Sequence, residues 1–309
     1  MRLVTRADFD GLACGSILME LGMIDSWLFV HPKDLQDGKI EVTENDVLTN
    51  VPYAPGCGMW FDHHASEMDR VGADVNVEGA RYIAPSCARI IYDYYEGSTR
   101  LPHLDEMVIA VDKVDSANLT VEEIINPKNW ILLGFIMDPR TGLGRQHSKF
   151  TIGNWELMGE LMDACRDFTI DELLMLPNVA ERVEYYHKQT KDFRLMIIEH
   201  SRVEGDAIIT DLRGVSPIHT GNRFLLYSLY PAQNISVWVA DGIIGNCMIA
   251  VGYSILDKSS TVHVGKIMAH YGGGGHMQVG TCQVPHEDTD QVIEELVHHI
   301  NSHERKPGV

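Results

Sequence analysis

The sequence predicts an α/β fold with an N-terminal doubly wound, mostly parallel sheet domain and a smaller C-terminal α/β domain of mixed sheet, joined by a helical connector. In the first half, short apolar runs alternate with helical patterns, which is typical of parallel sheets with crossover helices. From about residue 195 the pattern changes to closely spaced strands. The 309 residues suit two domains, which we expect at 1–190 and 195–309.

The elements of the first domain follow from the apolar pattern. Its predicted strands are the short apolar runs at 2–5, 27–31, 47–50 and 58–62. Helices are predicted at 11–23 and 84–96, where apolar residues recur at helical spacing. Another apolar run, 107–111, precedes an acidic segment. Residues 153–193 are predicted to form the helical connector, with Thr169 as an N-cap before an acidic first turn.

The second domain begins with alternating strand patterns. The predicted strands are 195–203, 206–214, 224–230, 235–242, 247–255 and 281–285. Residues 204–206 are expected to form a turn between the first two. Helices are predicted at 261–270 and 292–301, on either side of a glycine-rich segment.

The composition limits the classes of function. A formal net charge of −19 repels long nucleic acid, but it is compatible with small anionic substrates captured by bound cations. The six cysteines form no CxxC pair, so we expect reduced thiols and not a disulfide framework. No signal peptide is recognisable, and no apolar run reaches the ~18 residues that a membrane span needs. These features predict a cytoplasmic protein with no membrane partner.

Acidic and histidine residues follow several predicted strands. Parallel strands place their carboxyl ends at one edge, where ligands bind, so we expect Asp8, Asp10, Asn50 and the Asp62-His63-His64 motif to share one site. In an extended segment Asp8 and Asp10 would point to the same side, and a shared proton or a divalent cation would stabilise the pair. A solvated strand end that caps the next helix is the simpler alternative.

Asp62 emerges from a buried strand, where an unpaired charge would be costly. The two histidines that follow are expected to point to opposite sides, so that one binds metal and the other has a different role. Asp62 would ligate the metal or orient an imidazole. A third acidic cluster, Asp112 and Asp115, follows an apolar run, although a helix cap or turn would also explain it.

Four consecutive glycines, 272–275, precede His276 and a predicted strand. Glycine lets backbone N–H groups approach an anion closely, and His276 adds a donor that can be cationic. A flexible turn is the more common explanation for such a segment when it occurs alone.

Four motifs in this order resemble the DHH phosphoesterase superfamily, in particular its exopolyphosphatase-like and oligoribonuclease-like members. They are ADFDGLACGS, FDHHASE, AVDKVDSAN and YGGGGHMQVG, and together they span the chain from Asp8 to Gly280. The resemblance implies a DHH metal-binding catalytic domain followed by a DHH-associated substrate-binding domain. It also implies Mn²⁺, often as a pair of ions, with Mg²⁺ as the alternative cofactor.

The resemblance assigns roles to individual residues. The metal ligands that it implies are Asp8, Asp10, Asp62, His63 and Asp112, with Asp115 as the alternative to Asp112. His64 would meet the scissile phosphate, with Asp62 beside it. The terminal phosphate of the substrate would be bound by Gly273, Gly274, Gly275 and His276. The implied chemistry is hydrolysis by two metal ions about 3.5–4 Å apart that activate a bridging water.

The sequence departs from this family at the first metal position. Arg6 stands where relatives usually have a histidine, and Asn50 where many have a metal-bridging aspartate. Arg6 can supply fixed positive charge to the phosphate while a single metal, held by Asp10, His63 and Asp112, activates water. Asn50 would remain a weaker, neutral ligand. The alternative is a protein that has lost turnover and binds a nucleotide or phosphate ligand as a sensor.

A third departure concerns the second domain, where relatives carry an arginine in the strand ahead of the glycine segment. The nearest basic residue here is Lys258, and Arg213 and Arg223 are further candidates to line the substrate cleft. The predicted function is a metal-dependent phosphoesterase that acts on a small phosphorylated substrate. Candidate substrates are a short single-stranded oligonucleotide, a nucleotide phosphodiester and polyphosphate. A homodimer is one arrangement that the sequence leaves open.

Overall fold

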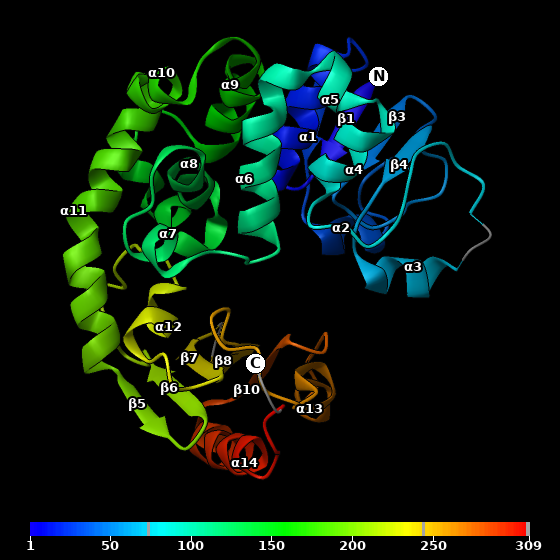
Figure 1. Cartoon of the computed structure of the whole chain (residues 1–309). Coiled ribbons are helices and arrows are strands. Elements are labelled where there is room, and N and C mark those ends of the chain that lie inside the picture. The colour runs from blue at the N-terminus through cyan, green and yellow to red at the C-terminus, as the bar shows by residue number, and fades with distance from the viewer. Residues whose placement is uncertain (73–74, 243–244, 307–309) are drawn as a thin grey trace. The chain divides into compact units, whose positions relative to one another are not determined.

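The computed structural model describes residues 1–72, 75–242 and 245–306 (Figure 1). Its internal contacts divide the chain into two compact units. Unit 1 comprises Met1–Asn118 and Asn126–His187, and unit 2 comprises Leu119–Ile125 together with the chain from Lys188 onward. The division therefore falls inside the long helix α11 (Pro177–Glu199), and a short segment of the first half of the chain belongs to unit 2.

Unit 1 is built on a parallel sheet, in which the strand order is β2–β1–β3–β4 and each neighbouring pair is parallel. The strands are β1 (Arg2–Thr5), β2 (Ser26–Phe29), β3 (Asp46–Thr49) and β4 (Met59–Phe61). The predicted parallel sheet is confirmed. The carboxyl ends of all these strands meet at one edge, which brings the segments after β1, β3 and β4 together.

Both faces of this sheet are covered, as a doubly wound fold requires. Leu3 and Val4 on β1 point to opposite faces and are both fully buried. On one face Val4 packs with Leu35 and Trp60, and on the other Leu3 lies near Gly15. The first helices are α1 (Phe9–Glu20), α2 (Pro32–Gln36), α3 (Ala65–Val71), α4 (Cys87–Tyr94) and α5 (Gly97–Arg100). Next come the 3-10 turn η1 (Pro102–Leu104), α6 (Asp105–Asp115), α8 (Asn129–Met137), and the 3-10 turns η2 (Pro139–Thr141) and η3 (Leu143–Lys149).

One local expectation for unit 1 is wrong. Helix α1 already begins at Phe9, so Asp8 and Asp10 do not share an extended segment. Asp8 is the N-cap of α1 because its carboxylate accepts the Gly11 N–H, and Asp10 lies in the first helical turn. The apolar run 107–111 lies inside helix α6, and Asp112 and Asp115, expected at the end of an element, lie in the last turn of this helix.

The predicted helical stretch 153–193 is confirmed as α9 (Asn154–Asp167), α10 (Ile170–Met175) and α11. Thr169 caps α10 as expected. Its hydroxyl accepts the Glu172 N–H (3.4 Å), and the Glu172 carboxylate accepts the Thr169 N–H (2.8 Å). This reciprocal capping box fixes where α10 starts.

Unit 2 contains a mixed sheet with the strand order β5–β6–β7–β8–β10–β9. Among the described strand pairs of this unit 2 sheet, β6–β7 is parallel and the others are antiparallel, which confirms the predicted mixed sheet. The strands are β5 (Ser201–Glu204), β6 (Ala207–Asp211), β7 (Ile235–Asp241), β8 (Asn246–Tyr253), β9 (Gly274–Gly275) and β10 (Val279–Pro285). Its helices are α7 (Val121–Ile125), α12 (Leu225–Leu229), α13 (Val264–His270), the 3-10 turn η4 (His286–Asp288) and α14 (Thr289–Asn301).

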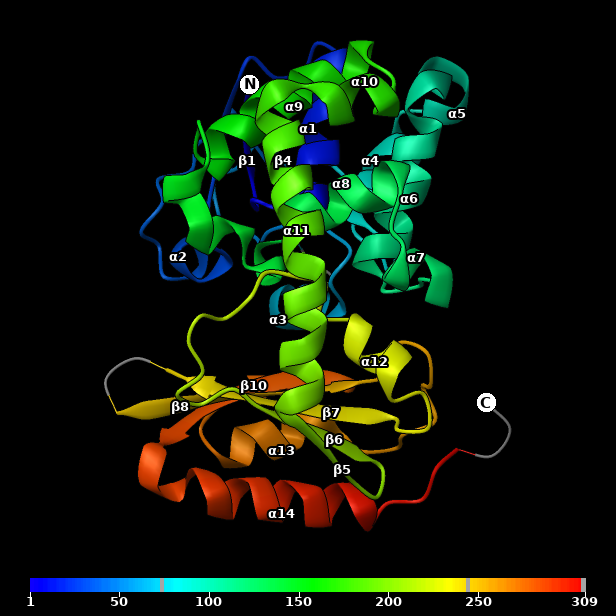
Figure 2. The ribbon, with the colours of Figure 1, turned by 90° about the vertical axis from the view of Figure 1, so that its left-hand side faces the viewer.

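Helices α13 and α14 lie on the same side of this sheet (Figure 2). Their apolar residues, such as Met268 and Leu296, form one buried core with Val237, Ile249 and Val284 of the strands. Alternate residues along β7, β8 and β10 therefore point into this core. We call this side of the sheet its core face.

Two predicted strands of the second domain are wrong. Most of the segment 195–203 continues helix α11, because Phe193, Met196 and Ile197 are buried at helical spacing while Leu195 and Ile198 are exposed. The segment 224–230 forms α12 instead of a strand. It contains no β-branched residue, and its leucines favour a helix. Among the described helices, none combines the length and apolarity needed to span a bilayer.

Candidate metal centre and active site

Asp8 is surrounded by hydrogen-bond donors at the end of β1. Its Oδ1 accepts the Gly11 N–H and the Asn50 side-chain amide, each at 3.0 Å, and its Oδ2 lies 3.0 Å from Arg6 Nε. Asn50 reaches Asp8 from a left-handed backbone conformation (φ 54°) directly after β3. Asn50 therefore acts as a donor to Asp8, and Arg6 supplies positive charge at the position where a first metal was expected.

Asp10 is almost completely buried, and its carboxylate meets the start of helix α4. Oδ2 accepts the Cys87 N–H (2.9 Å) and Oδ1 the Ala88 N–H (2.8 Å). Burial, followed by the charges of Asp115 and Asp8, raises the pKa of Asp10 well above its ordinary value despite these donors. A cation beside Asp10 would offset the cost of keeping it ionised.

The His63 ring is held so that one nitrogen faces two carboxylates. Nδ1 lies 3.2 Å from the Ala84 carbonyl oxygen, to which it donates, so in the neutral ring Nε2 carries the lone pair. Nε2 lies 3.3 Å from Asp115 Oδ2 and 3.8 Å from Asp10 Oδ2, and it is buried without a hydrogen-bond partner among the described residues. A lone pair and two carboxylates within 4.8 Å of one another fit a divalent cation.

Asp62 orients His64 and not His63. Its carboxylate is fully buried, and Oδ1 accepts a hydrogen bond from His64 Nδ1 (2.8 Å). Oδ2 is a second buried atom without a partner in the described part of the chain. Burial lowers the pKa of His64, but the hydrogen bond and charge of Asp62 outweigh it and raise that pKa overall.

The two histidine rings do not point to opposite sides. Their centroids lie 4.2 Å apart in an edge contact. The expectation relied on strand alternation, but β4 ends at Phe61, and His64 is already the N-cap of α3. Alternation of side chains therefore does not extend to this dipeptide.

Asp112 and Asp115 have separate roles in the fold. Asp112 accepts hydrogen bonds from the Ser86 hydroxyl (2.7 Å) and from Arg89 Nε (2.9 Å), which fastens α6 to the start of α4. Asp115 faces His63, one helical turn further along. The structure thus groups Asp115, and not Asp112, with Asp10 and His63.

Two further residues line this site that the sequence motifs did not predict, Asp138 and Arg140. Both line a small cavity of about 10 Å³, which Asp8, Asp10 and Asp115 also line. The Asp138 carboxylate accepts hydrogen bonds from the backbone and the guanidinium of Arg140 (2.8 and 2.7 Å). The sequence does contain a pattern that could have marked Asp138 as a site candidate. Asp138 directly follows an apolar run and precedes a proline, much as Asp62 directly follows an apolar strand.

The glycine segment in unit 2 forms a tight hairpin with β10. A Cβ on Gly273 would lie 2.0 Å from the Thr281 carbonyl oxygen, and one on Gly275 would lie 2.2 Å from that of Val279. These two glycines are therefore required by backbone packing alone, whereas Gly274 has open space at the Cβ position. His276 is exposed, and its backbone N–H donates to the Val279 carbonyl (2.7 Å), so the hairpin holds it firmly.

The basic candidates of unit 2 occupy different surroundings. Arg213 is held by ion pairs to Asp211 and Asp290, each at 2.6 Å. The guanidinium of Arg223 stacks over the Phe224 ring at 4.1 Å. Lys258 is half-buried. None of these contacts by itself assigns a substrate role.

Comparison with solved structures identifies the family. The chain is 43% identical to the pGpG-specific phosphodiesterase PggH from Vibrio cholerae, with 98% of this chain and 99% of that chain covered and a TM-score of 0.85. The chain belongs to the DHH phosphoesterase superfamily. No family model and no curated protein matches it.

More distant structures share the fold. An exopolyphosphatase-related protein from Bacteroides fragilis has 10% identity and a TM-score of 0.50 over 97% of this chain and 92% of that chain. RecJ from Thermus thermophilus, solved in complex with Mn²⁺, has 12% identity and a TM-score of 0.50 over 99% of this chain and 53% of that chain. The predicted phosphoesterase and hydrolase class is confirmed by the first relative. The homodimer and the cytoplasmic location stay predictions.

Proposed function

We propose that this DHH phosphoesterase is a Mn²⁺-dependent phosphodiesterase that cleaves a short linear dinucleotide of the pGpG type. The observation that carries the proposal is the 43% identity to a pGpG-specific phosphodiesterase over nearly the whole of both chains. The net charge of −19 supports a short substrate, because a long polyanion would be repelled.

The proposed metal ligands are Asp10, His63 and Asp115, and the unpartnered, buried His63 Nε2 supports them. Two carboxylates supply the oxygen ligands that Mn²⁺ prefers, and His63 adds a single nitrogen ligand. When bound, the cation activates a water and neutralises charge on the phosphoryl group. We propose one such ion, because the carboxylate of Asp8 already receives its donors from the protein.

The remaining residues of the site would bind and orient the phosphodiester. His64, partly exposed and held by Asp62, would donate a hydrogen bond to a phosphoryl oxygen. Arg6, whose guanidinium is paired with Asp8 and still partly exposed, would add fixed positive charge. In unit 2 we propose that Gly274 and His276 receive the terminal phosphate, since Gly274 alone of the glycines in β9 is free of close backbone contacts.

A surface on which a nucleobase can stack, which we call a base platform, would favour a dinucleotide substrate over polyphosphate. Tyr82 and Ile83 are exposed by 43% and 78%, and they immediately precede Ala84, whose carbonyl oxygen holds the His63 ring. Exposed aromatic and apolar side chains of this kind can stack a nucleobase. We therefore propose that Tyr82 contacts a base of the substrate.

The test is hydrolysis of pGpG by the full-length protein with Mn²⁺, with Mg²⁺ and after chelation. We expect Mn²⁺-dependent release of GMP that chelation abolishes. Polyphosphate and an artificial phosphodiester serve as competing substrates. Failure to cleave pGpG with either ion, while polyphosphate is hydrolysed, would contradict the proposed substrate.

Replacement of Tyr82 separates base recognition from chemistry. Tyr82→Ala should raise KM for pGpG by about tenfold, because stacking contributes about 1–3 kcal/mol per base. Hydrolysis of an artificial diester that lacks a base should change little. Tyr94→Ala is the matched control, because Tyr94 is equally exposed (43%) but lies at the end of α4. An equal loss on both substrates would contradict the base platform.

A further inference from the structure

A second group of metal-ligand side chains lies in unit 2, whereas the proposed Mn²⁺ ligands Asp10, His63 and Asp115 belong to unit 1. Asp241 is the last residue of β7, Cys247 is the second residue of β8, and His286 directly follows β10. Their ligand atoms lie within 4.8 Å of one another. The group combines a carboxylate, a thiol and an imidazole.

The sheet itself brings these side chains together. Asp241 is the register partner of Cys247 on the antiparallel strand β8, and Cys247 is the partner of Val284 on β10. Asp241 stands two residues after the buried Val239, and His286 stands two residues after Val284. Because alternate residues share a face, Asp241 and Cys247 belong to the core face of adjacent strands. His286 lies in η4, just beyond the end of β10, and its ligand atom lies within 4.8 Å of theirs.

The surroundings orient two of the three residues. Asp241 Oδ2 accepts the Gly214 N–H at 2.8 Å, which fixes its carboxylate. The His286 N–H donates to the Gly245 carbonyl at 2.9 Å, which anchors the residue to the β7–β8 turn. Hydrogen bonds of this kind commonly orient ligands around a metal. Within the described chain, the His286 imidazole makes no hydrogen bond or ion pair, so it is available as a ligand.

An ordinary core position does not account for this arrangement. Cys282 belongs to the same apolar core and is nearly fully buried, as many free cysteines are. Unlike Cys247, it is not part of any group of three metal-ligand side chains among the described residues. Cys247 differs because an aspartate and a histidine converge on it from both neighbouring strands.

We propose that Asp241, Cys247 and His286 form a Zn²⁺ site that is distinct from the proposed Mn²⁺ site. Thiolate and imidazole ligands favour Zn²⁺ over Mn²⁺ or Mg²⁺, which prefer oxygen. Three protein ligands leave the fourth tetrahedral position to water or to a ligand. Binding releases the thiol proton of Cys247 to solvent as the thiolate joins the metal.

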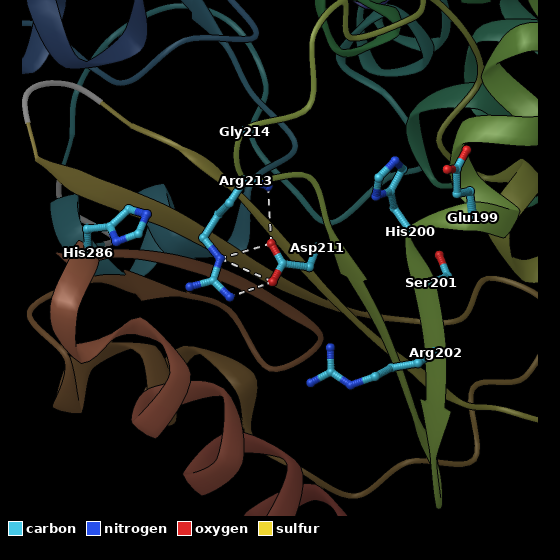
Figure 3. A pocket seen from close by; sticks show the side chains of 8 residues that line it. All are labelled: Glu199, His200, Ser201, Arg202, Asp211, Arg213, Gly214 and His286. Atoms are coloured by element: carbon cyan, nitrogen blue, oxygen red, sulfur yellow. Dashed lines mark hydrogen bonds and ion pairs between the residues drawn. The ribbon is translucent and has the colours of Figure 1, made fainter.

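The open position has a route to solvent. A cavity of about 600 Å³ in unit 2 is lined by His286 and by Gly214, the residue that holds Asp241. Figure 3 shows His286 on one side of Arg213 and His200 on the other, with Arg213 bonded to Asp211. His286 therefore borders an accessible cavity, and Asp241 and His286 are exposed, so metal ions can reach these two ligands without opening the core.

Titration of the metal-free, full-length protein with Co²⁺ tests the site. Co²⁺ replaces Zn²⁺ and gives a near-ultraviolet charge-transfer band only when a thiolate is a ligand. We expect this band in the wild-type protein, its displacement by Zn²⁺, and its loss in Cys247→Ser. His286→Ala changes an exposed residue and should weaken Co²⁺ binding by about tenfold to a hundredfold, as loss of one ligand implies.

Two variants serve as controls. Cys282→Ser removes a neighbouring buried thiol of the same core and should keep the band. His63→Ala removes the proposed Mn²⁺ site, near which Cys14 lies, and should also keep it. Absence of the band in the wild type, its persistence in Cys247→Ser, or its indifference to His286→Ala would each overturn the proposal. Because the readout is a spectrum, the result does not depend on phosphodiesterase activity.

Discussion

The two aspartates of the first motif differ in what surrounds their carboxylates. Asp8 receives the Gly11 N–H, the Asn50 amide and the Arg6 guanidinium. Asp10 receives two backbone N–H groups at the start of α4 and a long contact from the Cys14 thiol, and beyond them it faces His63 Nε2, which has no hydrogen-bond partner among the described residues. One carboxylate is neutralised by the protein, whereas the other still lacks a compensating cation.

Under the proposed one-ion site, this difference gives a physical reason for a metal at Asp10 and none at Asp8. Arg6 and Asn50 act on the same carboxylate, so the two departures in the sequence form one structural substitution. A guanidinium supplies charge without a coordination requirement. We call the groups around the Asp8 carboxylate the Asp8 side and those around the Asp10 carboxylate the Asp10 side. We therefore expect the Asp8 side to bind the negative charge of the substrate and the Asp10 side to hold the metal.

The largest expected effect is on the Asp10 side. His63→Ala should lower the Mn²⁺-dependent turnover of pGpG by about 10²–10³-fold, because several kcal/mol of charge stabilisation are lost and about 1.4 kcal/mol corresponds to a factor of ten. Steady-state kinetics and Mn²⁺ binding should both show the loss. His103→Ala is the control, since His103 is an exposed histidine of the same unit that pairs with Glu20. Full activity in His63→Ala would contradict the metal site.

The Asp8 side should show an intermediate effect. Arg6→Ala should raise KM for pGpG by about tenfold to a hundredfold, because a charge-assisted hydrogen bond contributes about 1.5–3 kcal/mol. Mn²⁺ binding should be retained. Arg6→Lys keeps the charge but loses the planar fork, so it should recover only part of the affinity. If Arg6→Ala removed Mn²⁺ binding and left KM unchanged, the assigned roles of the two sides would be reversed.

The sequence predicted the sheet and most of the site because both follow from local patterns. Apolar runs located the strands of unit 1, and parallel strands place their carboxyl ends together. Asp62 was expected to ligate the metal or orient an imidazole, namely that of His63, but it orients His64. This choice could not be predicted, because the chain leaves β4 at Phe61 and side-chain alternation ends there. Segments 195–199 and 224–230 were misassigned because short apolar runs without clear alternation fit either a helix or a strand.

Asp138 and Arg140 illustrate a different limit. They reach the site from η2, far along the chain from Asp8, and only tertiary packing brings them to the same small cavity. The choice between Asp112 and Asp115 likewise depended on which side of α6 faces His63. Helical spacing places the two residues about 60° apart around the axis, since three steps of about 100° fall short of a full turn. The sequence alone does not show whether Asp112 or Asp115 lies on the side of α6 that faces His63.

A double substitution should convert the Asp8 side into a metal position. Asn50→Asp with Arg6→His replaces two protein donors by two ligands, which gives three candidate ligands when Asp8 itself is counted. We expect Mn²⁺ stoichiometry, measured by calorimetry and metal analysis, to rise from one ion to two in a chain whose unit 2 cluster carries Cys247→Ser. Asn50→Asp alone should not bind the second ion, because Arg6 still pairs with Asp8. An unchanged Mn²⁺ stoichiometry in the double variant would contradict the claim that Arg6 and Asn50 take the place of a metal ion at Asp8.

The smallest effect on activity is expected at Asp112, which lies one helical turn from the proposed ligand Asp115. Asp112→Asn removes the charge that holds Arg89 and weakens the bond to Ser86, so it should lower the free energy of unfolding by about 1–2 kcal/mol, with partial exposure limiting the loss. Turnover with Mn²⁺ should stay within about twofold of the wild type.

Asp115→Asn should give the opposite result, because Asp115 makes no hydrogen bond that fastens α6 to α4 among the described residues, and its carboxylate faces His63. Burial raises the pKa of Asp115, so removing the charge costs the fold little in the absence of metal. Turnover should fall by about 10²-fold, since a lost ligand weakens both metal binding and charge stabilisation. Urea unfolding and kinetics on the two variants together decide the assignment. If Asp112→Asn abolished turnover at full metal occupancy and Asp115→Asn did not, the metal would lie on the α4 side of α6, away from His63.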